Sequence, residues 1–135
     1  MKLSILITLL NEELVLAQTH KAISEKLESM ILSEELSDYE ILYVDDGSSD
    51  STLELIDAIA DENPRVKYIS FSRNFGRESG ILAGFKYATG DAVMVMDGDL
   101  QHPPYLIPLF VEAYKEGYDI VSGQRSREGE SFVGS

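Results

Sequence analysis

Short apolar runs alternate with longer segments of helical periodicity along the sequence, and this alternation constrains the fold more than any other feature. Several of the runs contain consecutive apolar residues, which is typical of parallel strands covered on both faces. No internal repeat or low-complexity tract interrupts the order. We therefore predict βα units, with strands over residues 4–9, 40–44, 66–71, 92–96 and 119–122.

The segments between these runs predict four helices. Ser49 and Asp50 precede the second segment as capping candidates, and Gly90 and Gly117 follow the third and fourth as helix stops. The predicted helices span residues 13–32, 51–61, 77–89 and 104–115. This βαβαβαβ order predicts an α/β fold, a doubly wound and mostly parallel sheet with helices on both faces.

Polar clusters follow the predicted strands at the point where each strand ends. Asn11 and Glu12 follow the first, and further clusters stand at residues 45–48, 72–74 and 97–99. Ligands of such sheets bind outside the carboxyl ends of the strands, where the strand order reverses. We therefore expect one edge of the sheet to carry the chemistry.

The sharpest of these clusters is residues 97–101, which begins where an apolar run stops. The oxygens of Asp97, Asp99 and Gln101 suit a hard cation such as Mg²⁺ or Mn²⁺, with a diphosphate in its open coordination positions. The Asp-x-Asp spacing alone is weak evidence for a metal site, because ten Asp residues in a chain of this length give about 0.7 such triplets by chance. The position of the motif at the end of a strand is the stronger evidence for a metal site. The alternative interpretation is an acidic turn that caps the next helix. Because two carboxylates repel a diphosphate, phosphate binding here requires a cation.

A second acidic pair, Asp45 and Asp46, ends the second predicted strand. A carboxylate at this place accepts hydrogen bonds from a base N–H or a ribose hydroxyl. A turn with a helix cap explains residues 47–52, but it does not explain two adjacent like charges, which suggest a ligand partner. Glu12, at the end of the first strand, is positioned to meet the same ligand.

Three arginines lie near this edge of the sheet. Arg73 and Arg77 precede the third helix, and Arg125 follows the fifth strand. Arg73 or Arg77 could reach a phosphate group, and Arg125 is placed to approach the same edge. Ion pairing with neighbouring acids is the alternative for the first two, and a solvated loop position is the alternative for Arg125.

The composition excludes several function classes. Eleven basic and twenty-four acidic side chains give a formal net charge of −13, which disfavours binding to a nucleic-acid backbone. The absence of cysteine excludes disulfides, thiolate catalysis and zinc–sulfur sites. No stretch approaches the ~20 apolar residues that span a bilayer, so we expect this chain to be soluble. The glycine motifs of phosphate-loop NTPases and dinucleotide dehydrogenases are also absent.

Five motifs occur in order between residue 3 and about residue 127: Leu9-Leu10-Asn11-Glu12-Glu13, Asp45-Asp46-Gly47-Ser48-Ser49-Asp50, Asn74-Phe75-Gly76, Asp97-Gly98-Asp99-Leu100-Gln101-His102-Pro103-Pro104 and Val121-Ser122-Gly123-Gln124-Arg125. Together they resemble the family 2 glycosyltransferases, most of all the dolichol-phosphate mannose synthases and the bacterial undecaprenyl-phosphate sugar transferases. The resemblance implies a GT-A fold, an inverting reaction, a UDP- or GDP-sugar donor and a divalent cation, Mg²⁺ or Mn²⁺.

The resemblance also implies which residues hold the metal and the diphosphate. Asp97, Asp99 and Gln101 match the metal and diphosphate ligands of the family. Gly98, between the two acids, belongs to the same donor-binding turn. Arg125 matches an arginine that binds the donor phosphate.

The nucleoside side of the predicted site has three acids. Glu12, Asp45 and Asp46 match the nucleoside-binding acids of the family. The family usually shows Pro-x-Tyr-Asn-Glu after the first strand, whereas this chain has Thr8 and Leu10 in place of the proline and tyrosine. The contacts to the base therefore depart from the family pattern.

The leading hypothesis is metal-dependent, inverting transfer of a sugar from a UDP- or GDP-sugar to polyprenyl phosphate. Residues 1–127 are predicted to form the nucleotide-sugar-binding catalytic domain, and residues 128–135 to begin an acceptor-side segment. A lipid phosphate is already anionic, so the reaction needs no general base, and we assign none. This acceptor implies that the full-length protein is membrane-associated on the cytoplasmic side. A homo-oligomer is an open alternative to a monomer.

Three other functions remain open at this point. The first is a family 2 transferase that extends a saccharide, and the second is a non-catalytic nucleotide-binding module. The third is a phosphoacceptor signalling domain, which uses acidic pairs and Mg²⁺. Such a domain has its acid pair after the first strand and a lysine after the last, whereas this chain has Asp45-Asp46 after the second and Arg125 after the last.

Overall fold

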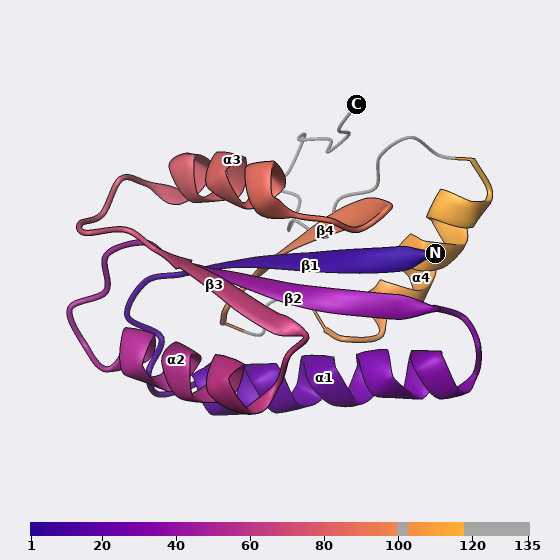
Figure 1. The fold of residues 1–135 in the computed structure, drawn as a ribbon, viewed down its shortest axis with the longest axis horizontal. Helices are drawn as coiled ribbons and strands as arrows, with labels where there is room; N and C mark the ends of the chain where they lie inside the picture. Colours follow the sequence, from indigo (N-terminus) through magenta and orange to yellow (C-terminus); the bar gives the residue numbers. More distant parts are fainter. Residues whose placement is uncertain (100–102, 118–135) are drawn as a thin grey trace.

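A computed structural model describes residues 1–99 and 103–117 of the chain (Figure 1). Within these residues strands and helices alternate throughout. In chain order the elements are β1 (Lys2–Leu9), α1 (Leu16–Leu32), β2 (Asp38–Asp45), α2 (Thr52–Glu62), β3 (Val66–Ser70), α3 (Arg77–Tyr87), β4 (Ala92–Asp97) and α4 (Leu106–Lys115). The first four predicted strands and all four predicted helices are confirmed. The predicted strand at 119–122 and the segment 128–135 lie outside the described residues.

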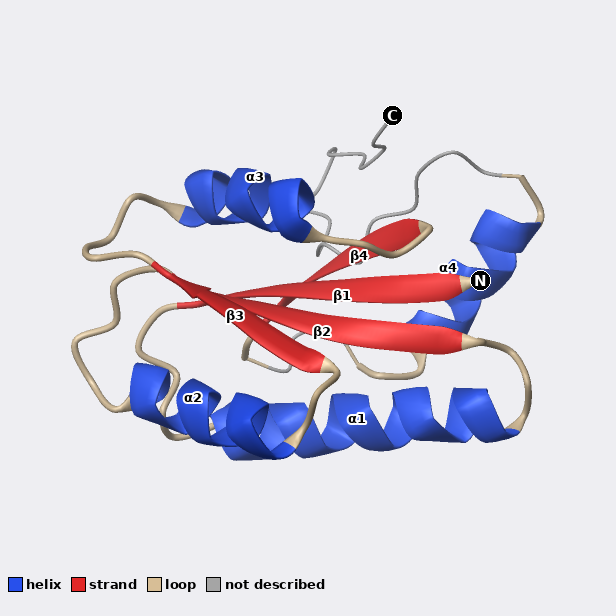
Figure 2. Ribbon diagram, in the orientation of Figure 1, coloured by secondary structure: helices blue, strands red, loops and turns tan. Residues whose placement is uncertain are grey.

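The strands form one parallel sheet in the order β3-β2-β1-β4 (Figure 2). The register sets Leu9 opposite Asp45 on one side of β1, and Thr8 opposite Asp97 on the other. The strand order reverses between β1 and β4, which is where open α/β sheets bind ligands. The predicted α/β class and parallel sheet are therefore confirmed, and the ends of β1, β2 and β4 meet at one edge.

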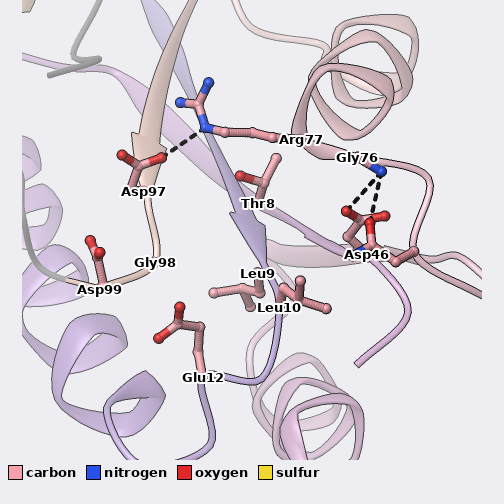
Figure 3. A pocket seen from close by; sticks show the side chains of 11 residues that line it. Thr8, Leu9, Leu10, Glu12, Asp46, Gly76, Arg77, Asp97, Gly98 and Asp99 are labelled. Carbon is pink, nitrogen blue, oxygen red and sulfur yellow. Dashed lines mark hydrogen bonds and ion pairs between the residues drawn. The ribbon is translucent and has the colours of Figure 1, made fainter. Parts of the chain in front are cut away.

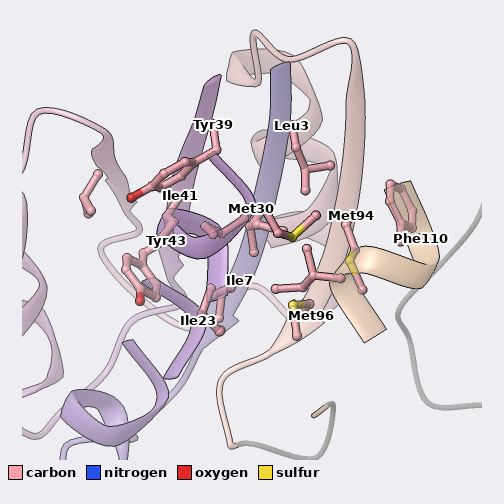
Figure 4. Packing of buried hydrophobic residues seen from close by; sticks show 14 of the residues in the cluster. Leu3, Ile7, Ile23, Met30, Tyr39, Ile41, Tyr43, Met94, Met96 and Phe110 are labelled. Atoms are coloured by element: carbon pink, nitrogen blue, oxygen red, sulfur yellow. The ribbon is translucent and has the colours of Figure 1, made fainter. Parts of the chain in front are cut away.

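The main core lies on one face of the sheet, where α1, α2 and α4 pack (Figure 4). Alternate residues of β1 point to this face, because side chains along a strand alternate between its two faces. They meet apolar side chains from β2, β4 and the three helices. The members include Leu3, Ile5, Ile7, Leu9, Ile23, Met30, Ile41, Ile56, Met94, Met96 and Phe110.

The opposite face carries α3, which approaches the sheet through glycines (Figure 1). A Cβ atom on Gly84 would lie 2.1 Å from Leu6 Cδ1, and one on Gly80 would lie 3.1 Å from Thr8 Cγ2. The bulkier Leu82 and Phe85 of the same helix are exposed. This helix can therefore approach the sheet closely because Gly80 and Gly84 have no side chains.

Several helix boundaries differ from the predictions by one to three residues, and among them α2 spans Thr52–Glu62 and α4 begins at Leu106. Helix α1 begins at Leu16 and not at residue 13; residues 13–15 form a turn, in which the N–H groups of Val15 and Leu16 donate to the Glu12 carbonyl. Helix α3 ends at Tyr87, and the chain is already extended at the following residue. Gly90 is thus no helix stop; its N–H donates to Ser4 Oγ at 2.8 Å. Among the described helices, none has both the length and the apolar composition needed to cross a membrane.

Candidate active site

A pocket of about 310 Å³ opens at the carboxyl ends of β1 and β4 (Figure 3). Its walls come from the loops that follow β1, β2, β3 and β4, as the strand-end clusters predicted. The lining residues are Thr8, Leu9, Leu10, Glu12, Asp46, Asn74, Gly76, Arg77, Asp97, Gly98 and Asp99.

The loop after β1 is tied to the loop after β2 by hydrogen bonds. Asn11 has a left-handed backbone (φ 54°), which Asn tolerates better than most residues. Its Oδ1 accepts the N–H groups of Ser49 at 2.8 Å and Asp50 at 3.3 Å. The N–H of Glu12 donates to Thr52 Oγ1 at 2.9 Å. The two loops thus form one hydrogen-bonded rim, from which the Glu12 side chain faces the pocket (Figure 3).

Asp46 joins the same rim to the loop after β3. It is only 4% exposed, and its carboxylate accepts the N–H groups of Phe75 at 2.8 Å and Gly76 at 3.1 Å. Next to it, Gly47 has a φ of 76°, and a Cβ atom there would lie 2.3 Å from the carbonyl carbon of Arg73. Glycine is required at 47 both by the backbone angle and by this close approach.

The Asp97-Gly98-Asp99 turn is held from below by the core. A Cβ atom on Gly98 would lie 2.1 Å from Leu9 Cδ2, so the backbone rests directly on this side chain. The Gly98 carbonyl accepts a hydrogen bond from Thr19 Oγ1 at 3.2 Å, and Thr19 is fully buried in α1. The turn therefore presents both carboxylates to the pocket from a fixed backbone.

Arg77, the first residue of α3, pairs with Asp97 across the pocket. Its Nε donates to Asp97 Oδ1 at 3.0 Å. Its Nη2 atom is buried and has no hydrogen-bond partner in the described part of the chain. The prediction for Arg77 allowed either a phosphate contact or an ion pair with a neighbouring acid, and the ion pair is present.

The pocket concentrates negative charge. Burial raises the pKa of Glu12, and the nearby carboxylates of Asp99, Asp50 and Asp97 raise it further. Each of these neighbours disfavours the ionised form of Glu12 through like-charge repulsion. A cation bound among these groups would relieve the repulsion.

The described residues fit a divalent cation held jointly with a ligand. Asp97 and Asp99 supply two carboxylates, and Mg²⁺ is usually bound by one or two carboxylates together with substrate phosphates. Residues 1–99 and 103–117 contain no group of three acidic or histidine side chains that could hold a metal by itself. The third predicted ligand, Gln101, lies outside the described residues, so the full set stays a prediction.

Asp45, a further predicted site residue, is not among the residues that line this pocket. Asp45 is 1% exposed, and its carboxylate accepts the N–H of Ser48 at 3.3 Å. Arg125 lies outside the described residues. Arg73 also turns away from the lining set, since its guanidinium stacks on the Phe75 ring at 4.7 Å from the centroid.

Sequence reasoning missed the support beneath the acidic turn. Thr19 looked like an ordinary helical residue, and nothing in its local pattern marked it. Its bond to Gly98 joins positions 79 residues apart in sequence, so only the packing of α1 reveals it. The contacts of Asp46 to two amides were also not foreseen, although the glycine after it was a signal of close packing.

A sequence profile described as "Glycosyl transferase family 2" matches residues 4–134. The chain belongs to this family. The predicted resemblance is therefore confirmed over nearly the whole chain.

Relatives with curated sequences agree with the family. The chain is 48% identical over 133 residues to the CsbB protein of Bacillus subtilis, covering 98% of this chain and 39% of that protein. It is 40% identical over 128 residues to the bactoprenol glucosyl transferase of Shigella phage SfX, covering 93% of this chain and 40% of that protein. The chain thus spans about two-fifths of the length of these relatives.

Solved structures establish the fold. The mannosyltransferase PcManGT of Pyrobaculum calidifontis, in complex with GDP-Man and Mn²⁺, superposes with a TM-score of 0.59 at 18% identity, covering 72% of this chain and 27% of that chain. Residues 1–349 of S. aureus TarS superpose with a TM-score of 0.56 at 23% identity, covering 86% of this chain and 33% of that chain. Both neighbours are GT-A glycosyltransferases, and the predicted GT-A fold is confirmed.

Proposed function

We propose that the full-length protein transfers a sugar from a UDP- or GDP-sugar to polyprenyl phosphate, with inversion and with a divalent cation. The observation that carries this proposal is the pocket at the reversal of strand order, where Asp97 and Asp99 share one turn within a family 2 chain. The name of a relative at 40% identity, a bactoprenol glucosyl transferase, supports the lipid-phosphate acceptor.

In this proposal the donor diphosphate binds beside the acidic turn. Asp97, Asp99 and Gln101 hold Mg²⁺ or Mn²⁺, which supplies Lewis-acid stabilisation of the charge on the departing diphosphate. The N–H of Gly98 lies on the same turn, and Glu12 faces it from the opposite wall. Without a cation the carboxylates would repel the diphosphate by on the order of 4 kcal/mol per charge pair at ~4 Å.

The nucleoside is assigned to the rim formed by the loops after β1 and β2. Asp45 ends β2 there, Asp46 follows it and lines the pocket, and Leu10 lines the pocket nearby. A partly exposed Leu10 offers an apolar surface to the flat face of a base. Arg125 is proposed to bind the donor phosphate from the segment beyond α4.

The transfer step needs no proton acceptor in the protein. An oxygen of the lipid phosphate attacks the anomeric carbon, a new carbon–oxygen bond forms, and the bond to the diphosphate breaks on the opposite face. The nucleoside diphosphate leaves with the electron pair of that bond. Because the attacking oxygen is already anionic, the work of the pocket is to orient the donor and to stabilise the leaving group. A lipid acceptor would bring the full-length protein to the cytoplasmic side of a membrane.

Acceptor and donor trials on the full-length protein test this proposal. Undecaprenyl phosphate in detergent, or an oligosaccharide, is incubated with labelled UDP-glucose, UDP-GlcNAc or GDP-mannose, with MnCl₂ or with EDTA. We expect labelled lipid with at least one donor and none in EDTA. Transfer to the oligosaccharide alone would favour the saccharide-extending alternative, and nucleotide binding without any transfer would favour a non-catalytic module.

A variant of the acidic turn tests the residues. Asp99→Ala should weaken UDP or GDP binding in Mn²⁺ by about tenfold or more, since it removes a charged ligand of the cation. The matched control is Asp57→Ala. It removes an exposed carboxylate of α2 that accepts a hydrogen bond from the Tyr68 hydroxyl of β3 and does not line the pocket. Titration calorimetry with and without Mn²⁺ measures both. Nucleotide binding that does not require Mn²⁺, and whose affinity is unchanged by Asp99→Ala, would contradict the site assignment.

A further inference from the structure

Arg77 is the only cationic side chain among the described residues that line the pocket. The same pocket is lined by the carboxylates of Glu12, Asp46, Asp97 and Asp99. Arg77 approaches Asp97 from α3, on the face opposite α1 and α2 (Figure 3). Its guanidinium therefore stands beside a carboxylate to which the proposed function assigns the cation.

The guanidinium uses only part of its bonding capacity in this pair. Arginine has five N–H donors in a planar fork. Nε serves Asp97 Oδ1 at 3.0 Å, while the buried Nη2 has no partner among the described residues. A buried donor without a partner is costly, so a ligand that accepts from it gains affinity. The planar fork is suited to the oxygens of a phosphate.

The pair is also able to open. The side chain of Arg77 is 36% exposed and that of Asp97 is 23% exposed, and ion pairs with this access to water are weak. The backbone at the start of α3 is held, because Gly76 donates its N–H to Asp46. The guanidinium can therefore leave Asp97 by side-chain rotation alone.

We propose that Arg77 is a counter-ion of Asp97 that a divalent cation displaces, and that the released guanidinium then binds the diphosphate of the donor. This inference rests on the proposed function. A cation on Asp97 repels the guanidinium and competes for the same carboxylate, while an incoming diphosphate attracts it. Arg77 thus weakens metal binding in the absence of nucleotide and strengthens nucleotide binding once the metal is bound.

The proposal predicts that one substitution changes the affinities for Mn²⁺ and for nucleotide in opposite directions. Arg77→Gln should bind Mn²⁺ alone more tightly, by about threefold, because the competing charge is gone. The same variant should bind UDP or GDP at saturating Mn²⁺ more weakly, by about tenfold, because a charge-assisted phosphate contact is lost. Calorimetry measures both on the full-length protein, and circular dichroism checks that the variant is folded.

Arg73→Gln is the matched control. It removes the same charge from the loop just before α3, but Arg73 stacks on Phe75 and does not line the pocket. It should leave the affinity for Mn²⁺ and for nucleotide within about twofold of the wild type. Equal effects of the two variants would mean a general electrostatic influence and would overturn the specific role of Arg77.

A spectroscopic measurement covers the case of a variant that does not fold. In the wild-type protein, the Nε–H resonance of Arg77 should shift on addition of Mg²⁺ and shift again on addition of UDP or GDP. The proposal is that Arg77 exchanges Asp97 for the donor diphosphate. An Nε–H resonance that does not shift on addition of Mg²⁺, or weaker Mn²⁺ binding by Arg77→Gln, would overturn this exchange. If the wild type binds neither Mn²⁺ nor nucleotide, the proposed function itself fails; if it binds both and Arg77→Gln behaves like wild type, only the exchange fails.

Discussion

Asp46 holds a charge where water hardly reaches it. At 4% exposure, its carboxylate depends on the N–H groups of Phe75 and Gly76, which belong to a different loop. Charge-assisted hydrogen bonds of this kind are among the strong ones in proteins. The residue thus fixes the start of α3 and, through it, the origin of the Arg77 side chain. A single buried carboxylate in this way sets the geometry of a pocket wall.

Removing that carboxylate should cost stability. We expect Asp46→Ala to lower the free energy of unfolding by about 1–3 kcal/mol, since the partly buried N–H groups of Phe75 and Gly76 lose a charged acceptor. Urea denaturation measures the change. Asp57→Ala, at an exposed position on α2, should stay within about 0.5 kcal/mol of wild type. An equal loss in the two variants would contradict the role of Asp46 in holding the loop.

At the scale of elements, α3 differs from the other helices. Helices α1, α2 and α4 bury large apolar side chains in the main core, whereas the buried residues of α3 are Gly80 and Gly84. A helix without side chains on its inner face lies close to the sheet. Its position is therefore set by steric fit against Leu6 and Thr8, and small changes there should move the whole helix.

The two glycines make a matched pair for testing this fit. Gly84→Ala should destabilise the protein by about 1–3 kcal/mol, because its Cβ would lie 2.1 Å from Leu6 Cδ1 in a packed contact. Gly80→Ala should cost less, since its nearest neighbour would be 3.1 Å away and alanine favours a helix by roughly 0.8–1.0 kcal/mol over glycine. Thermal denaturation compares the two. Adding Leu6→Ala to Gly84→Ala should cost less than the sum of the single changes.

At the scale of the whole molecule, the two ends of the sheet use acidic residues differently. The carboxyl-end edge gathers carboxylates around a pocket, where a bound cation would relieve their mutual repulsion. The amino-end edge buries Glu40, at 2% exposure, in a set of hydrogen bonds from Ser4 Oγ, Thr89 N–H and Lys67 Nζ. The first arrangement places several carboxylates around one pocket, and the second holds a buried carboxylate in a set of hydrogen bonds within the fold.

The pH dependence of stability should reveal the second arrangement. Burial by itself would raise the pKa of Glu40, but its hydrogen bonds from Ser4, Thr89 and Lys67 lower it to about 2. A folded pKa below the ordinary value of 4.5 means that the contribution is complete above about pH 4.5 and is lost as the pH falls toward 2. The full contribution is about 3 kcal/mol.

Glu40→Gln isolates this contribution. The difference in unfolding free energy between wild type and variant should be largest above pH 5 and should shrink as the pH falls from 4.5 toward 2. Urea titrations at several pH values measure it. Glu54→Gln, on the exposed first turn of α2, is the matched control for the change of residue type. A constant difference across the range would contradict the lowered pKa of Glu40.

Local patterns in the sequence determined the elements and the edge at which the site lies. Apolar runs and helical periodicity predicted five strands in a mostly parallel sheet, and the four that fall within the described residues are present and parallel. The order of the strands, and the place where it reverses, came from the structure. The acidic turn at residues 97–99 and the polar residue Glu12 were found because parallel strands end at one edge. The family resemblance, confirmed by the profile match, supplied the GT-A fold.

Only the tertiary structure decided how these residues share the site. The sequence left Arg77 between a phosphate contact and an ion pair, and the structure shows the ion pair with Asp97. Asp46 and Thr19 act through partners 29 and 79 residues away, and such contacts depend on loop and helix packing that no local pattern records. The physical reason is range: backbone preferences act over a few residues, whereas burial and charge act between whichever groups the fold brings together.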